Sequence, residues 1–137
     1  MSKLKVLVPL DGSEKSMHSL NWLKKFFGKE ELEITLINVF QMFYSGEMIP
    51  VRSLYENVAS ESKQVLENAA KELEGYKVNA LSATGFIPDV ILKEAKDGNY
   101  DMIVMTKSSV KGISRILGSV TTKVVRDSEV SVIVVPE

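Results

Sequence analysis

The 137-residue chain contains no cysteine and one histidine, and its charges almost cancel, with 17 Lys and Arg against 18 Asp and Glu. The absence of cysteine excludes disulfide bonds, thiolate catalysis and zinc–thiolate sites. The formal net charge of -1 provides no electrostatic attraction toward nucleic acid or an anionic membrane. No apolar run approaches the roughly 20 residues that a membrane-spanning helix needs. The sequence therefore predicts no nucleic-acid partner and no membrane span.

Residues suited to catalysis are also scarce. His18 is the single histidine, and because no partner residue is evident we interpret it as a surface residue rather than a general base. No spacing of His, Asp and Glu suits a metal ion, and no nucleophile stands beside a base. We therefore predict no catalytic residue, no metal site and no enzymatic activity.

The amino-terminal region carries no recognisable export signal. Its apolar run, residues 6–10, is interrupted by Pro9 and ended by Asp11. Such a run is too short for the apolar part of a signal peptide, and no small-residue cleavage site follows it. We expect a cytoplasmic protein.

The sequence does contain a regular alternation of strand and helix patterns. Apolar, mostly β-branched runs predict strands at residues 5–10, 32–40, 76–81, 102–105 and 130–135. Apolar residues at helical spacing predict helices within residues 13–28, 54–75, 88–98 and 119–126, with a loop at 41–52. Parallel strands need crossovers, which helices supply, so the prediction is one open, doubly wound parallel sheet. No linker composition divides the chain, and we expect a single domain over residues 1–137.

In such a sheet, ligands bind beyond the carboxyl ends of the strands. The segments 9–12 and 105–109 would flank one crevice if the first and fourth strands are neighbours. Asp11 could accept a hydrogen bond there from a ribose hydroxyl or an exocyclic amine. The alternative is that Asp11 and Ser13 only turn and cap the chain.

A second candidate lies at the start of the last predicted helix, Gly118-Ser-Val-Thr-Thr122. The first N–H groups of a helix lack intrahelical acceptors, and the helix dipole favours an anion, so this segment could hold phosphate. The alternative is an ordinary serine-capped helix. Lys107, Lys111 and Arg115 could neutralise a polyphosphate, or they could form a solvated basic edge.

These segments resemble the universal stress protein family over nearly the whole chain. The resemblance is carried by residues 5–13, 85–95, 101–105, 118–125 and 131–136, in the family's order and spacing. It implies five parallel strands in the order 3-2-1-4-5 with helices on both faces, a Rossmann-like fold of the adenine nucleotide alpha hydrolase type. It also implies a homodimer with a stress-linked role in the cytoplasm.

The family contains ATP binders and members that hold no nucleotide. In the ATP binders, adenine and ribose lie against the first two strands, and phosphates lie against the loop after the fourth strand and the following helix start. The resemblance therefore implies these nucleotide-binding residues: Pro9, Leu10, Asp11, Val39, Met105, Thr106, Ser108, Ser109, Gly118, Ser119, Val120 and Thr121.

One part of the sequence departs from the ATP binders. Their motif, G-x2-G-x9-G-[ST], would place its first two glycines at Thr106 and Ser109, and the spacer to Gly118 is one residue short. A side chain can block close backbone approach, and it penalises a positive φ by roughly 1 kcal/mol or more. Two hypotheses stay open: weak binding of ATP or another adenine nucleotide without efficient turnover, or a protein-interaction module that binds no nucleotide.

The expected dimer also has a physical argument. A strand at residues 130–135, placed at a sheet edge, would expose unpaired backbone groups and apolar side chains. A two-fold related copy would cover that edge. The alternative is that the chain's own helices shield it.

Overall fold

The computed structural model describes residues 2–41, 52–107 and 118–136. The elements alternate along the chain as β1 (Leu4–Pro9), a short 3-10 turn η1 (Lys15–Met17), α1 (His18–Phe26), β2 (Leu32–Phe40), α2 (Arg52–Lys71), β3 (Lys77–Thr84), α3 (Ile87–Asp97), β4 (Met102–Thr106), α4 (Ser119–Asp127) and β5 (Ser131–Val135). None of these described helices combines the length and the apolar composition needed to cross a bilayer.

The strands form one parallel sheet in the order β3-β2-β1-β4-β5. This confirms the predicted fold, including the pairing of the first and fourth strands. β1 aligns Val6 with Met102 of β4 and with Ile34 of β2, so β1 lies between the two. The carboxyl ends of these three strands consequently meet at one edge of the sheet.

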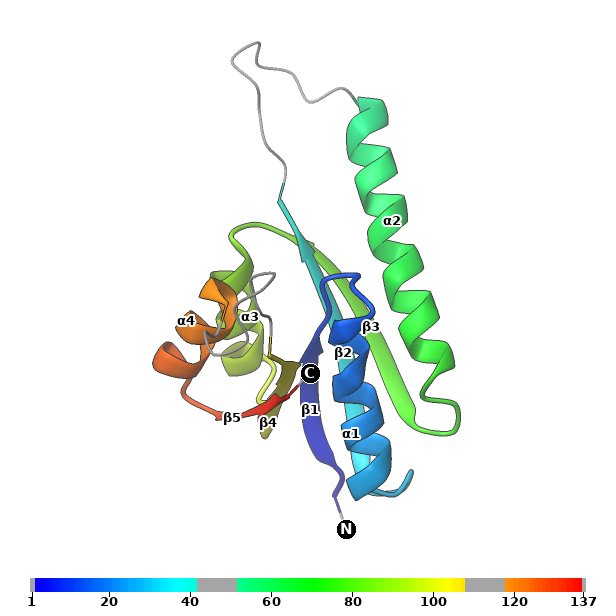
Figure 1. Cartoon of the computed structure of the whole chain (residues 1–137), viewed down its shortest axis with the longest axis vertical. Helices are drawn as coiled ribbons and strands as arrows, with labels where there is room; N and C mark the ends of the chain where they lie inside the picture. The colour runs from blue at the N-terminus through cyan, green and yellow to red at the C-terminus, as the bar shows by residue number, and fades with distance from the viewer. Residues whose placement is uncertain (1, 42–51, 108–117, 137) are drawn as a thin grey trace.

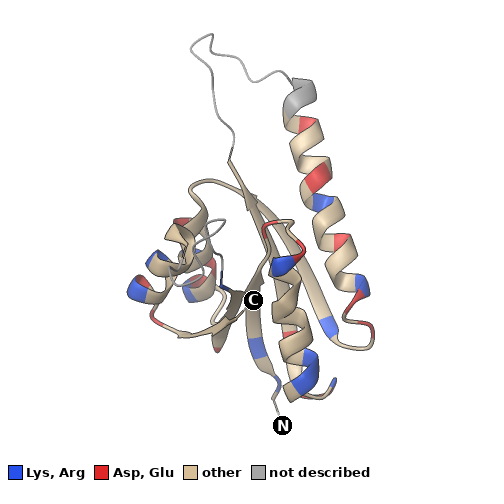
Figure 2. Ribbon diagram, viewed as in Figure 1, with Lys and Arg blue, Asp and Glu red and all other residues tan. Residues whose placement is uncertain are grey.

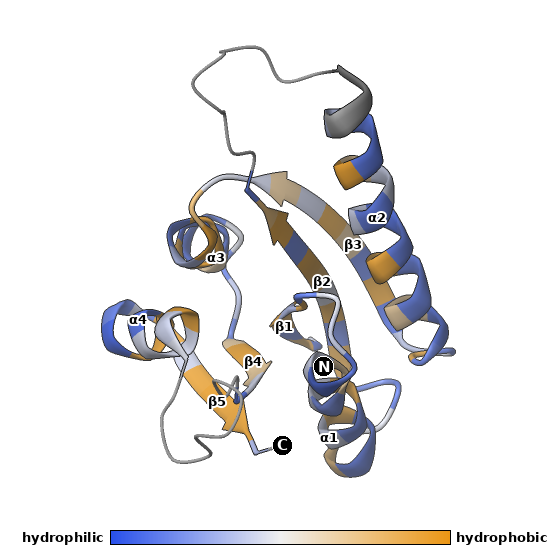
Figure 3. Ribbon diagram, turned by 45° about the horizontal axis from the view of Figure 1, so that its top comes forward, coloured by the Kyte–Doolittle hydropathy of each residue, from blue (hydrophilic) through white to orange (hydrophobic). Residues whose placement is uncertain are grey.

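Helices cover both faces of the sheet, with α1 and α2 on one side and α3 and α4 on the other (Figure 1). Side chains alternate between the faces along each strand, so Val6 and Val8 join the core beneath α1 and α2 while Leu7 joins the core beneath α3 and α4. All three are fully buried. A strand buried on both faces requires a continuous apolar run, and β4, which is buried at every residue, shows such a run in the hydropathy colouring (Figure 3). The edge strand β5 is also mostly apolar but only partly buried.

Charged side chains of both signs occur on α2, α3 and α4, whereas α1 carries only Lys24 and Lys25, and the strands carry few charges (Figure 2). This agrees with the nearly balanced composition of the whole chain.

The structure corrects several predicted boundaries. The long helix predicted within 54–75 is α2, which begins earlier, at Arg52, and ends at Lys71, four residues before Gly75. β3 extends to Thr84 instead of residue 81, because the long β2 continues beside it and pairs Val39 with Ala83 and Phe40 with Thr84. The first α-helix begins at His18, and the 3-10 turn before it has Glu14 as its N-cap, not the predicted Ser13. Ser13 lies just ahead of that turn, where its hydroxyl accepts a hydrogen bond from the N–H of Ser16 at 3.2 Å. Most of the loop predicted at 41–52 lies outside the described residues.

A candidate ligand cleft at the carboxyl ends of the strands

A cleft of about 360 Å³ opens where β1, β2 and β4 end, on the side covered by α3 and α4. We call it the β1–β4 cleft. It is lined by Pro9, Leu10, Asp11, Ser16, Ile37, Val39, Ile87, Ile91, Met105, Thr106, Gly118, Ser119, Val120 and Thr121. The lining combines strand ends with the first turns of two helices, which is where open α/β sheets bind ligands.

The floor and one wall of the cleft are apolar. Val39 and Met105 belong to the buried core of this face, and Ile91 of α3 packs into the same core. Ile87, one turn earlier on α3, is partly exposed and packs against that core. An apolar floor of this kind suits the faces of a flat, weakly polar ring.

Asp11 lies at the rim, in a turn built around its own carboxylate. Its Oδ1 accepts hydrogen bonds from the N–H of Ser13 at 2.8 Å and from the Ser13 hydroxyl. Gly12 between them has φ +89°, and an added Cβ would lie 3.2 Å from Val65, so a side chain is disfavoured there. The turn interpretation of Asp11 is correct, and the same residue also lines the cleft.

The chain leaving β1 is held in place by β2. The N–H of Leu10 donates to the carbonyl of Ile37 at 2.9 Å, and the buried Asn38 side chain donates to the carbonyl of Leu10 at 2.8 Å. Both backbone polar groups of Leu10 are therefore satisfied, which fixes the position from which Asp11 projects.

Thr106 is tied to the opposite face of the sheet. Its Oγ1 accepts a hydrogen bond from the N–H of Ser19 at 3.0 Å and lies 2.7 Å from the Ser19 hydroxyl. It also donates to the carbonyl of Ser16 at 3.3 Å. The side chain that replaces the first motif glycine is thus buried and used to attach β4 to the start of α1.

The start of α4 closes the cleft. Gly118 is the N-cap, with φ -62° and ψ 161°, and no side chain caps the helix. The carbonyl of Gly118 accepts the N–H of Thr122 at 2.9 Å, which forms the first helical hydrogen bond. The N–H groups of residues 119–121, ahead of this bond, lie at the positive end of the helix dipole. Because the φ of Gly118 is negative, its backbone conformation does not require glycine.

All nucleotide-binding residues implied by the resemblance that lie in the described part of the chain line this cleft. Lys107, a candidate phosphate contact, is described but is not among the lining residues. Ser108, Ser109, Lys111 and Arg115 fall outside the described residues. Sequence reasoning missed four lining residues, namely Ser16, Ile37, Ile87 and Ile91. Their positions in the sequence could have indicated two of them. Ile37 lies two residues before Val39, on the same face of the strand, and Ile87 lies two residues after Gly85, at the start of the predicted third helix. His18, the predicted surface residue, is partly exposed at the start of α1 and is not among the lining residues.

The groups with shifted pKa values lie away from the cleft. A hydrogen bond from Lys77 lowers the pKa of the partly exposed Glu33 carboxyl, and one from Arg126 lowers that of Asp127. Burial raises the pKa of Tyr100, which precedes β4 at the amino ends of the strands. Among the described residues, no three His, Asp or Glu side chains gather as a group that could hold a metal ion.

A parallel sheet of this order with a cleft at its switch point defines a class of Rossmann-like α/β proteins. The model of the universal stress protein family matches residues 4–136. The chain belongs to the universal stress protein family.

A curated relative supports the same assignment at the level of sequence and structure. Universal stress protein MJ0577 of Methanocaldococcus jannaschii is 30% identical over 96% of this chain and 93% of its own length. A solved structure of MJ0577 superposes with a TM-score of 0.82 at 31% identity, covering 100% of this chain and 98% of that one.

Two more distant structures share the fold and were solved with ligands. A universal stress protein family protein from Arabidopsis thaliana with AMP bound has a TM-score of 0.72 at 21% identity, covering 98% of this chain and 92% of its own. The universal stress protein of Archaeoglobus fulgidus in complex with dAMP has a TM-score of 0.65 at 15% identity, with 98% coverage of both chains.

Proposed function

We propose that this protein is a single-domain universal stress protein that binds an adenine nucleotide weakly in the β1–β4 cleft, without efficient turnover. We further propose that it acts as a homodimer in the cytoplasmic stress response. The observation that carries the binding proposal is the convergence of Asp11, an apolar floor and the start of α4 on one cleft. The AMP and dAMP complexes of the Arabidopsis and Archaeoglobus relatives favour a monophosphate among the adenine nucleotides.

The three parts of the cleft match the three parts of a nucleotide. Val39 and Met105 offer apolar surface to the base, and a volume of about 360 Å³ falls within the range of small-molecule sites. Asp11 offers carboxylate oxygens to a ribose hydroxyl at the rim. The N-terminus of α4 favours a phosphate through its backbone N–H groups and its dipole.

The described lining favours binding over chemistry. Asp11 is the one carboxylate among the described lining residues, and its Oδ1 already accepts two bonds from Ser13. No second titratable acid or base is among the described residues that line the cleft, whereas general acid–base catalysis requires a positioned proton donor or acceptor.

Isothermal titration of the purified protein with AMP, and with ATP plus magnesium, tests the proposal. Saturable heat is expected, and a flat trace to millimolar nucleotide would contradict binding. Asp11→Asn keeps an acceptor for Ser13 but removes the charge, so we expect about tenfold weaker binding. Asp101→Asn is the matched control. The Asp101 carboxylate accepts a hydrogen bond from the N–H of Lys5 at 2.8 Å, and it lies just before β4, at the amino ends of the strands and away from the cleft.

A second candidate function is a protein-interaction module that holds no nucleotide. It is favoured by Thr106, whose buried hydroxyl binds Ser19 where the ATP-binding motif has glycine. Under this hypothesis the protein retains its dimeric state while the titrations stay flat.

A further inference from the structure

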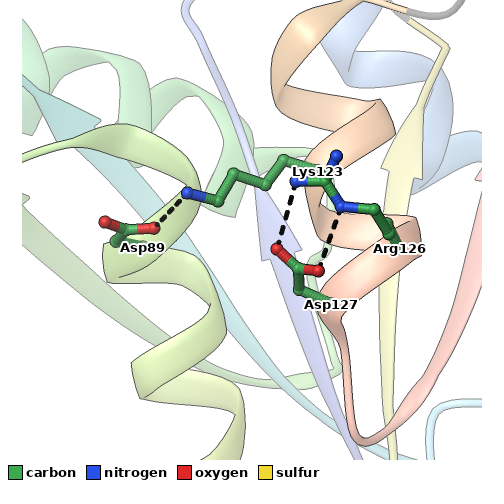
Figure 4. Close-up of polar contacts among 4 residues, drawn as sticks. All are labelled: Asp89, Lys123, Arg126 and Asp127. Atoms are coloured by element: carbon green, nitrogen blue, oxygen red, sulfur yellow. Dashed lines mark hydrogen bonds and ion pairs between the residues drawn. The ribbon is translucent and has the colours of Figure 1, made fainter.

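A lysine of α4 is bound to α3 beside the cleft. The Lys123 ammonium lies 3.0 Å from Asp89 Oδ1, in the first turn of α3 (Figure 4). The same ammonium lies 5.1 Å from the centre of the Phe86 ring, at the N-cap of α3. We call these three residues the α3–α4 clasp.

The clasp connects the two helices that form one side of the cleft. Ile87 and Ile91, which flank Asp89 along α3, line the cleft, and so do the residues 118–121 that precede Lys123. α4 packs against α3 and, less extensively, against the edge strand β5. Both helices also pack onto the sheet through a shared core that includes Ile91 of α3 and Val124 of α4, and the contacts between the helices add to this packing in setting their relative position.

The clasp residues do not themselves line the cleft. Lys123 is one helical turn after Ser119 and its side chain leans toward the helix N-terminus, as helical side chains do. The ammonium is nevertheless directed to the carboxylate and aromatic ring of α3. Its charge is thus engaged by Asp89, which argues for an effect on the cleft walls and against direct contact with a ligand.

The neighbouring ion pairs do not join the walls of the cleft. Arg126 and Asp127 are adjacent on α4, and Lys93 and Asp97 are one turn apart on α3. Lys96 of α3 does reach Glu129, at 3.8 Å, but this contact lies near the far ends of both helices.

From this arrangement we infer that Phe86, Asp89 and Lys123 are positioning residues: their contact fixes α3 against α4 and thereby sets the affinity of the cleft. The inference rests on the proposed nucleotide binding. Because the ion pair is partly exposed, its contribution is modest, and we expect each single substitution to weaken binding about threefold.

A double-mutant cycle of Asp89→Asn and Lys123→Met, titrated with AMP and with adenosine, tests the inference. The double variant is expected to bind no more weakly than either single variant, because each change breaks the same contact. Adenosine lacks the phosphate of AMP. If the substitutions act by displacing the cleft walls and not by a contact with phosphate, the affinities for AMP and adenosine should fall by the same factor. The pair Lys96→Met and Glu129→Gln is the matched control and should leave both affinities unchanged.

Amide hydrogen exchange without ligand gives a readout that does not depend on nucleotide binding. Faster exchange confined to α3 and α4 in the clasp variants, and absent from the control variants, supports the inference. Unchanged affinity and exchange would overturn it, and so would a loss restricted to AMP, since Lys123 would then act on the phosphate itself. If the wild-type protein binds neither ligand, the proposed function fails, and the exchange rates alone decide whether the clasp fixes the helices.

Discussion

The hydroxyl oxygen of Thr106, at the end of β4, lies 2.7 Å from the hydroxyl oxygen of Ser19 in α1. Thr106 stands where the family's ATP-binding motif begins with glycine, and in this protein the side chain at that position makes a structural contact with α1. The Thr106 side chain attaches the end of β4 to α1, and its loss would leave the buried N–H and hydroxyl of Ser19 without this acceptor.

Thr106→Val should destabilise the fold by roughly 1–3 kcal/mol, because it removes the acceptor for buried donors while keeping the volume. Thr106→Ser keeps the hydroxyl and should cost less, about 0.8 kcal/mol for the lost methyl. Urea unfolding followed by circular dichroism measures both values. A Thr106→Val variant as stable as the wild-type protein would show that these hydrogen bonds contribute nothing. Thr106→Gly restores the motif residue and should be at least as destabilising as Thr106→Val.

Gly118→Asp should change stability and nucleotide affinity in opposite directions. A carboxylate at the N-cap interacts favourably with the positive end of the helix dipole, and any residue can adopt a φ of -62°. The stability should therefore stay equal or rise by roughly 0.3–1 kcal/mol. The same negative charge repels a phosphate at the start of α4, so AMP affinity should fall about tenfold. Gly118→Asn is the neutral control with a similar shape. Equal AMP affinity in the Asp and Asn variants would argue against a phosphate at this helix.

The proposed homodimer predicts that a charge on β5 disrupts assembly. Val134 is half-buried on this edge strand, and Val134→Lys places an ammonium where a second copy would pair. Sedimentation at micromolar concentration should show a dimer for the wild-type protein and a monomer for the variant. Ala80→Lys, at an exposed position on the opposite edge strand β3, should remain dimeric. A monomeric wild-type protein would contradict the proposal.

Tyr100 should make stability sensitive to alkaline pH. Burial raises the pKa of its phenol, and its hydroxyl donates to Glu94 Oε2 at 3.1 Å. A group whose pKa is raised by folding contributes stability fully below its unfolded pKa of about 10, and loses that contribution as pH rises through the folded pKa. Urea unfolding on either side of that pH should show a steeper loss for the wild-type protein than for Tyr100→Phe. Parallel pH dependences would contradict the prediction.

The sequence predicted the fold well because its strongest patterns lie in the buried strands. β2 begins and ends at the predicted residues, since Leu32 to Phe40 is apolar enough to be unmistakable. β3 was predicted too short because Ser82 and Ala83 near its end have weak strand preference, and pairing with β2 extends the strand to Thr84. A partner strand is not visible in a local pattern.

The cleft was predicted less completely, for a related reason. Asp11 and Gly118 were found because they follow or precede regular elements at places where ligands bind. Ile87 and Ile91 have the spacing of ordinary core residues, and nothing local distinguishes an isoleucine in the core from one that lines a cleft. The hydrogen bonds of Thr106 join residues 87 positions apart, which no spacing rule reveals.

The cleft takes residues from segments far apart in the chain, with 9–11 at the end of β1 and 118–121 at the start of α4. A chain still emerging from the ribosome, or one that has lost α4, has no complete cleft. Any small molecule that requires both segments binds only the finished fold and stabilises it by mass action. Occupancy would therefore distinguish completed molecules from partly folded ones, and the protection it gives would grow with ligand concentration.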